Sequence, residues 1–161
     1  MQWLRLAIAI VGLGGSALCQ AQTLYTNPVC EYSVTFPDVP LTKEDEFTTR
    51  TEFEAIPYLS AKCFRCPHAC RFRSTLEKQL LSELLAQFEL KDYVLTNESV
   101  LRSGFLISGI TTKENSVTRI AARVLFSENS ILVLATVQPE AVDKTIANAF
   151  LQSAQRRTNA P

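Results

Sequence analysis

The chain has 161 residues, with 16 basic and 16 acidic side chains, so its formal net charge at neutral pH is zero. This length supports one domain with a sizeable core and is short for two. The balanced charge gives no field that would recruit nucleic acid or an anionic membrane without specific contacts, so we expect neither as a partner.

The N-terminus has the pattern of a secretory signal peptide. Arg5 supplies a positive charge, residues 6–18 form an uncharged apolar run too short to span a bilayer, and small residues follow. We expect cleavage after Ala21, so that residues 1–21 are removed. The mature protein is then expected in the bacterial periplasm or outside the cell.

Lipidation at Cys19 is the less favoured alternative, because Leu18 stands where a lipobox needs a small residue. After cleavage, residues 22–155 are expected to form a single domain and residues 156–161 a flexible tail. No later apolar run is long enough to cross a membrane.

The first predicted strand covers residues 30–36, where Tyr32, Val34 and Phe36 alternate with polar residues. Residues 37–40 end it, and the acidic residues 43–47 are expected to form a solvated loop. The carboxylates of this loop lack the spacing of a calcium site.

A second strand is expected over residues 49–56 and 58–64, bent at the intervening Pro57. The clearest helix begins at Ser74, which with Glu77 forms a capping box. The apolar stripe of this helix, expected to pack on a sheet, consists of Leu76, Leu80, Leu81, Leu84, Leu85 and Phe88.

Four further strands are expected, over residues 92–101, 103–112, 117–126 and 130–138, the last two joined as a hairpin by a short turn. Gly104 and Gly109 indicate bulges or close contacts. In the strand over 117–126, one face carries Ile120, Ala122, Val124 and Phe126, and the other carries Arg119, Ala121, Arg123 and Leu125.

Pro139 is expected to open a last helix over residues 139–155, with Val142, Ile146, Ala149 and Phe150 facing inward. The element order predicts an α+β fold in which two main helices cover an antiparallel sheet. A strand–helix–strand unit with a glycine-rich turn is lacking in the sequence, so a dinucleotide site is not expected.

The chain resembles the PsbP-like fold in four features: YSVTFPDVP near its start, a central amphipathic helix, the hairpin VTRIAARVLF with SILVLATVQPEAV, and AFLQS in the closing helix. The resemblance covers most of residues 30–153. It implies an α/β/α sandwich with an antiparallel sheet, a fold shared by photosystem accessory proteins, a nuclear-import factor and small exported bacterial proteins of unassigned role. It implies binding rather than enzymatic activity and supplies no catalytic residue.

Removing Cys19 from the five cysteines leaves four, Cys30, Cys63, Cys66 and Cys70, and an even count in an exported domain is typical of disulfides. If residues 30–36 and 58–64 pair as an antiparallel hairpin, Cys30 lies beside Cys63, and Cys66 and Cys70 close a short loop. The competing pattern joins Cys30 to Cys66 and Cys63 to Cys70. The domain is expected to be braced by two disulfides in either case.

Other uses of the cysteines are less favoured. Pro67 follows Cys66 where haem attachment needs histidine, and zinc binding by the four thiolates competes with oxidation. A thiol–disulfide site at Cys63 and Cys66 remains open, because neighbouring basic residues lower a thiol pKa. His68, the only histidine, cannot build a histidine-based catalytic or metal site by itself, and we expect no metal and no cofactor.

Six basic residues are candidate binding residues for an acidic partner, although they also suit pairing with the chain's own acids. Four lie around the cysteine cluster and two lie on one predicted strand: Lys62, Arg65, Arg71, Arg73, Arg119 and Arg123. The leading hypothesis is a non-enzymatic exported accessory or binding protein that contacts an acidic protein or another envelope component. A redox protein using Cys63 and Cys66 is the alternative, and an inhibitor or immunity-type protein is the third.

Overall fold

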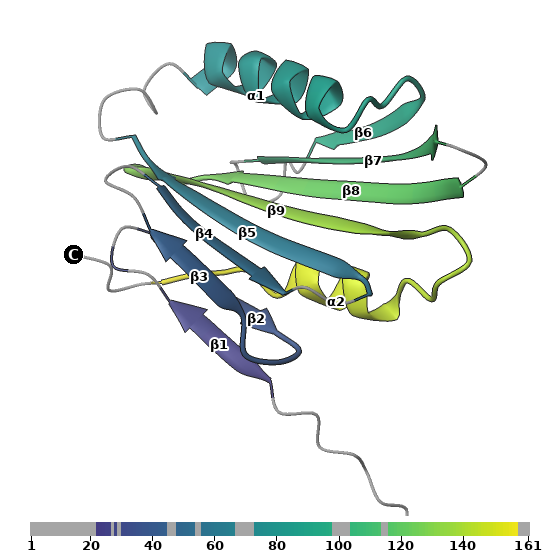
Figure 1. Ribbon diagram of the computed structural model, residues 1–161. Coiled ribbons are helices and arrows are strands. Elements are labelled where there is room, and N and C mark those ends of the chain that lie inside the picture. Colours follow the sequence, from purple (N-terminus) through teal and green to yellow (C-terminus); the bar gives the residue numbers. More distant parts are fainter. Residues whose placement is uncertain are drawn as a thin grey trace, which may run out of the picture.

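The computed structural model describes residues 22–26, 28, 30–44, 48–53, 56–66, 73–97, 104–113 and 116–157. The predicted signal peptide, Cys70, Arg71 and residues 158–161 lie outside these ranges. The described strands form two antiparallel sheets, which two helices accompany (Figure 1).

The large sheet has seven strands, and every neighbouring pair in it is antiparallel. In spatial order, the strands are β3 (Leu41–Glu44), β4 (Thr48–Phe53), β5 (Tyr58–Arg65), β9 (Ser130–Pro139), β8 (Ser116–Phe126), β7 (Gly104–Lys113) and β6 (Tyr93–Asn97).

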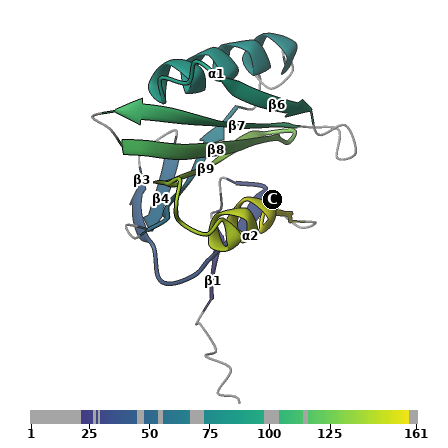
Figure 2. The same cartoon turned by 90° about the vertical axis from the view of Figure 1, so that its right-hand side faces the viewer.

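The small sheet has three strands in the order β1 (Thr23–Thr26), β2 (Tyr32–Phe36) and β10 (Gln155–Arg156). The helices are α1 (Arg73–Gln87) and α2 (Thr145–Gln152). Figure 2 shows α1 on one side of the large sheet, and α2 on the other side together with β1 of the small sheet.

Each face of the large sheet has its own apolar core. The leucines of α1 pack against the face formed by Phe105, Ile107, Val124 and their neighbours on β7, β8 and β9. The opposite core unites side chains of β2 and α2 with those of β5, β8 and β9: Tyr32, Val34, Phe36, Leu59, Ala61, Leu125, Leu132, Leu134, Phe150 and Leu151. The large sheet thus lies between α1 on one face and, on part of the other face, a layer made of α2 and the small sheet.

The hairpin predicted between residues 30–36 and 58–64 is wrong. β2 pairs with β1 and β10, whereas β5 pairs with β4 and β9. Cys30 and Cys63 are nevertheless bonded as predicted, with their Cα atoms 5.9 Å apart. The disulfide therefore joins the segment just before β2 to the large sheet. Alternation of apolar residues indicates a strand, but it does not identify the neighbour of that strand.

Pro57 separates two strands instead of bending one. β4 ends at Phe53 and β5 begins at Tyr58, and the two pair along six positions from Thr48↔Phe64 to Phe53↔Leu59. Part of the acidic segment 43–47 is also a strand rather than a loop, because β3 extends to Glu44. Residues 45–47 lie outside the described ranges.

The predictions for β7, β8, β9 and α1 are confirmed in outline. The β8–β9 hairpin turns at residues 127–129, and every residue of the predicted α1 stripe packs into the core on that face. α1 begins at Arg73, so Ser74 lies inside the helix rather than at its cap. Gly104 and Gly109 make close contacts: a Cβ at Gly109 would lie 2.7 Å from the carbonyl oxygen of Asp92.

The start of α2 differs from the prediction. Pro139 ends β9, and the helix begins six residues later at Thr145. The Gln138 amide donates to the carbonyl of Val142 at 3.1 Å, and the Asp143 carboxylate accepts the Thr145 N–H at 2.8 Å, which together fix the turn between strand and helix. The buried residues of α2 are Ala147, Phe150 and Leu151, so Phe150 faces inward as predicted but the exposed Ile146 and Ala149 do not.

The C-terminal boundary predicted at residue 155 falls within a strand. Gln155 and Arg156 form β10 and pair with Ser33 and Tyr32 of β2. The Arg157 N–H also donates to the Glu31 carbonyl at 2.8 Å. The described fold therefore continues into the first residues of the predicted tail.

Candidate functional site

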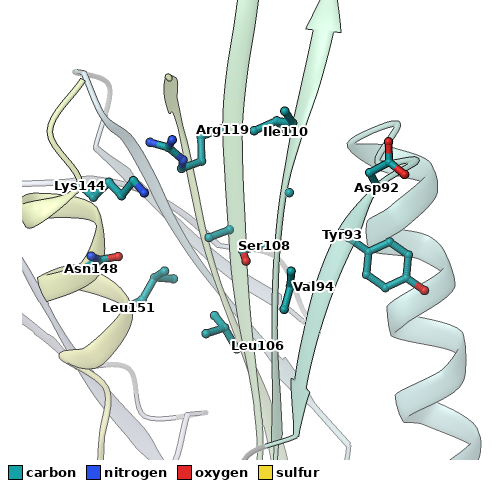
Figure 3. A pocket seen from close by; sticks show the side chains of 12 residues that line it. Asp92, Tyr93, Val94, Leu106, Ser108, Ile110, Arg119, Lys144, Asn148 and Leu151 are labelled. Carbon is teal, nitrogen blue, oxygen red and sulfur yellow. The ribbon is translucent and has the colours of Figure 1, made fainter. Parts of the chain in front are cut away.

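An open hollow of about 620 Å³ lies between α2 and the end of the large sheet formed by β6, β7 and β8 (Figure 3). Its lining residues are Asp92, Tyr93, Val94, Leu106, Ser108, Gly109, Ile110, Arg119, Ala121, Lys144, Asn148 and Leu151.

The hollow exists because α2 and the small sheet cover only part of the face on which they lie. Their core includes residues of β5, β8 and β9 but no buried residue of β6 or β7. On that uncovered part, Val94 is 65% exposed and Ile110 is 45% exposed. Apolar side chains of β6 and β7 therefore line a surface open to solvent.

Cationic and amide side chains gather at one end of the hollow. Arg119 points from β8 toward α2, and Lys144 and Asn148 reach from the α2 segment toward the sheet (Figure 3). Arg119 donates to the carbonyl of Glu140 at 3.2 Å and forms an ion pair with its carboxylate at 3.4 Å. Within the described part of the chain, the ammonium of Lys144 has neither an ion pair nor a hydrogen bond.

The other end of the hollow is apolar. Antiparallel pairing of β7 with β8 sets Ile110 opposite Arg119, Ser108 opposite Ala121 and Leu106 opposite Arg123. Leu106 at this end is joined by Leu151 from α2 and Val94 from β6 (Figure 3). Arg123, opposite Leu106, donates to the Leu151 carbonyl and does not line the hollow. The lining cations Arg119 and Lys144 therefore lie at one end, beside Ile110, and the lining near Leu106 is apolar.

The six basic residues singled out in the sequence do not form one group. Lys62 lies on the α1 side of the sheet, 4.8 Å from the Phe64 ring centroid, whereas Arg119 and Arg123 face α2. Arg65 is exposed at the end of β5, and Arg73 is the first residue of α1. Arg71 lies outside the described ranges.

Arg123 has a structural contact. Its guanidinium donates to the carbonyl of Leu151 at 2.8 Å, which ties β8 to the last turn of α2. Arg119 is thus the predicted arginine that lines the hollow, and sequence reasoning missed its companions Lys144 and Asn148. Their spacing of four residues already places both on one face of the helix expected over residues 139–155, but nothing in the sequence shows that this face lies beside Arg119.

Cys63 and Cys66, the two cysteines of the CxxC motif, are not bonded to each other. Cys63 is bonded to Cys30, and each of these residues is 2% exposed. Cys66 is also disulfide-bonded, and its predicted partner Cys70 lies outside the described ranges. Because Cys30 and Cys63 are oxidised and buried, neither sulfur is available as a zinc ligand or as an exposed nucleophile.

A second polar cluster lies next to the disulfide, where Glu31 binds the turn between β8 and β9. Its carboxylate accepts the Asn129 N–H at 3.0 Å and lies 3.5 Å from the Ser130 hydroxyl. Burial acts to raise the pKa of Glu31, but hydrogen bonds from Ser127, Asn129 and Ser130 and the charge of Arg156 together lower it below its ordinary value of 4.5. Ser130 is fully buried, so this cluster is a brace between layers rather than an open site.

Asp143 also serves the backbone. Its carboxylate accepts both the hydroxyl and the N–H of Thr145 at 2.8 Å, and these bonds lower the pKa of Asp143 below its ordinary value of 3.8. A further hollow of about 400 Å³, between β2 and α2, has no charged residue in its lining. The hollow with Arg119 and Lys144 is therefore the better candidate for recognising a charged ligand.

The described part of the chain has neither a cluster typical of a metal site nor a helix suited to crossing a membrane. No cluster of three or more histidine, cysteine, aspartate or glutamate side chains there has the arrangement of a metal site. None of the described helices has the length and apolar character needed to cross a bilayer.

Comparisons with known proteins bear on the fold alone. No family model and no curated protein matches the sequence. Among solved structures, the solution structure of cyanobacterial PsbP (CyanoP) from Synechocystis sp. PCC 6803 matches with a TM-score of 0.54 and 10% identity, over 91% of this chain and 98% of that one.

A crystal structure from Bacteroides thetaiotaomicron VPI-5482 matches with a TM-score of 0.52 and 11% identity, over 88% of this chain. The match covers 50% of the length of that protein. At such low identity these likenesses carry no information about ligands. They confirm the expected likeness in fold: the chain has a PsbP-like fold.

Proposed function

We propose that this chain is a non-enzymatic exported binding protein, and that the hollow between α2 and β6–β8 recognises an acidic component of the cell envelope. The observation that carries the proposal is the convergence of Arg119 and Lys144 on one end of an apolar hollow. Apolar pockets with a few converging polar groups are the usual form of a small-ligand site.

The disulfide supports export. A buried structural disulfide is typical of an oxidising compartment outside the cytoplasm. Together with the signal-like residues 1–21, it favours the periplasm or the cell exterior. We further propose that Cys66 pairs with Cys70, which would make a second brace beside the first.

The same bond argues against the redox alternative. A thioredoxin-type site needs two neighbouring cysteines that can bond to each other, one of them accessible, whereas Cys63 is paired with the distant Cys30 and both are buried. No comparable observation favours an inhibitor or immunity role over a binding role.

The proposal is tested by site-specific photo-crosslinking in whole cells. A photoreactive amino acid at Ile110, which is 45% exposed in the hollow, is expected to capture an envelope component. The same group at Ser82, exposed on α1 at the opposite side of the sheet, serves as the control.

Capture at Ile110 should fall severalfold in Arg119→Gln and Lys144→Gln, because each change removes a cation from the hollow. Equal thermal unfolding midpoints would show that the variants fold. Capture that is unchanged in both variants, or equally strong from Ser82, would contradict the proposal.

A further inference from the structure

We infer that the ligand of this hollow is a single-chain anionic amphiphile, whose acidic head lies between Arg119 and Lys144 and whose tail runs toward Leu106 and Leu151. This inference rests on the proposed binding function and names the ligand class of the same site.

The cationic and apolar residues of the lining lie at opposite ends of the hollow, as the head and tail of such a molecule require. Arg119 pairs with Ile110 at the cationic end, and Leu106 marks the other end. The β8 partner of Leu106 is Arg123, but its guanidinium donates to the Leu151 carbonyl and does not line the hollow, so the lining at that end is apolar.

Leu106 and Ile110 are four residues apart along β7. At about 3.3 Å per residue, this distance is roughly 13 Å. Ser108 and Ala121, which pair between the two ends and line the hollow, have small side chains.

The polar end offers donors for an acidic head. The Arg119 guanidinium uses part of its five N–H groups on Glu140, and these bonds hold it at the hollow with donors to spare. Lys144 and Asn148 bring an ammonium and an amide from the facing helix. The nearby Asp143 carboxylate is occupied by Thr145 and does not line the hollow.

Two carboxylates near the hollow, those of Asp92 and Glu140, affect how strongly its cations attract an anionic head. Asp92 lies at the opposite rim, beside Tyr93, away from Arg119 and Lys144 in Figure 3. Glu140 is the acid in contact with Arg119, and its side chain is 48% exposed. An anionic head therefore competes with Glu140 for Arg119, and removal of Glu140's charge should strengthen binding.

The apolar end and the size of the hollow favour a small amphiphile over a protein. Val94, which lies beside Leu106 at this end, is 65% exposed in the unliganded chain, so a hydrocarbon tail can cover apolar surface that now faces water. The volume of about 620 Å³ lies within the range of small-molecule sites, roughly 300–1,000 Å³.

The test is a titration of the purified exported protein with decanoate, below the concentration at which it forms micelles. Binding is followed by two-dimensional NMR and by calorimetry. We expect saturable binding that shifts the amide signals of Leu106, Ser108, Ala121 and Asn148. Acetate, which lacks the tail, and decyltrimethylammonium, which carries the opposite charge, should bind at least about tenfold more weakly.

Three variants sharpen the result. Arg119→Gln and Lys144→Gln should each weaken decanoate binding by about tenfold, as expected for the loss of a charge-assisted contact. Glu140→Gln should strengthen it severalfold, a result that a purely structural role of Arg119 would not produce. The exposed position of Lys144 makes its variant the safest for folding.

The inference is overturned by equal binding of the cationic amphiphile, by signal changes confined to the α1 side, or by absence of saturable binding. In the last case, retained charge-dependent capture at Ile110 would leave the proposed binding function standing with a different ligand. Loss of both results would reject the function together with its ligand.

Discussion

Glu31 shows how single residues join the layers of this protein. Its carboxylate accepts from Asn129, its own N–H donates to the Ser130 hydroxyl at 3.1 Å, and its neighbour Cys30 is bonded to Cys63. A covalent and a hydrogen-bonded link between the small and large sheets thus stand side by side. The sequence analysis favours the Cys30–Cys63 bond, although from a hairpin that the structure does not contain. Nothing local marks Glu31 as more than a solvated acid.

Glu31→Gln is expected to lower the free energy of unfolding by about 1 kcal/mol at neutral pH, because a charge-assisted contact at a partly exposed site becomes a neutral one. The folded-state pKa lies below the ordinary value of 4.5, so this stabilisation is present above that value and is lost as pH falls through the folded-state pKa. Urea unfolding at neutral pH and in acid should show the difference between variant and wild type shrinking in acid.

Glu128→Gln is the matched control. Its carboxylate lies 3.5 Å from the same Arg156, but its side chain is 81% exposed. An exposed pair of this kind should contribute less than about 0.5 kcal/mol. Equal effects of the two substitutions, or an effect of Glu31→Gln that persists undiminished in acid, would show that the carboxylate does not brace the turn.

At the scale of elements, the two helices differ in how well the sequence describes them. α1 is 15 residues long, and its regular leucines define one stripe over four turns. α2 has only 8 residues, and its five apolar side chains cover a wider face than the three that are buried, Ala147, Phe150 and Leu151. Which of these side chains are buried is therefore decided by the sheet on which α2 packs. The sequence pattern correctly places Phe150 in the core, but it wrongly adds Ile146 and Ala149.

Phe150 and Ile146 test this assignment of the α2 faces. Phe150 is 2% exposed, with its ring centroid 4.9 Å from that of Phe36, whereas Ile146 is 39% exposed. Phe150→Ala should lower the free energy of unfolding by about 3–5 kcal/mol, and Ile146→Ala by less than about 1 kcal/mol. Chemical denaturation of both variants measures the difference. Comparable losses would place Ile146 in the core, as the sequence pattern alone suggested.

At the scale of the whole molecule, the sequence predicts the layers better than their connections. Alternation in β8 and the α1 stripe correctly separate the two cores. Membership of β2 in a second sheet was not predictable, because strand pairing depends on segments far apart in sequence, such as β10 after residue 154. The hollow was missed for the same reason: it exists only where the sheet extends beyond α2.

The central claim about the whole molecule is that its disulfides are structural. They link parts of the fold and do not take part in thiol–disulfide exchange. Trypsin cleaves after Lys62, Arg65 and Arg71, so it separates Cys63 from Cys66 while keeping Cys66 with Cys70. Mass spectrometry of a non-reducing digest of the exported protein therefore reads the pairing directly. We predict that peptide 63–65 is joined to the peptide that contains Cys30, and that peptide 66–71 is closed on itself. A bond between peptides 63–65 and 66–71 would contradict the account, and fragmentation that places this bond on Cys66 rather than on Cys70 would restore the thiol–disulfide alternative.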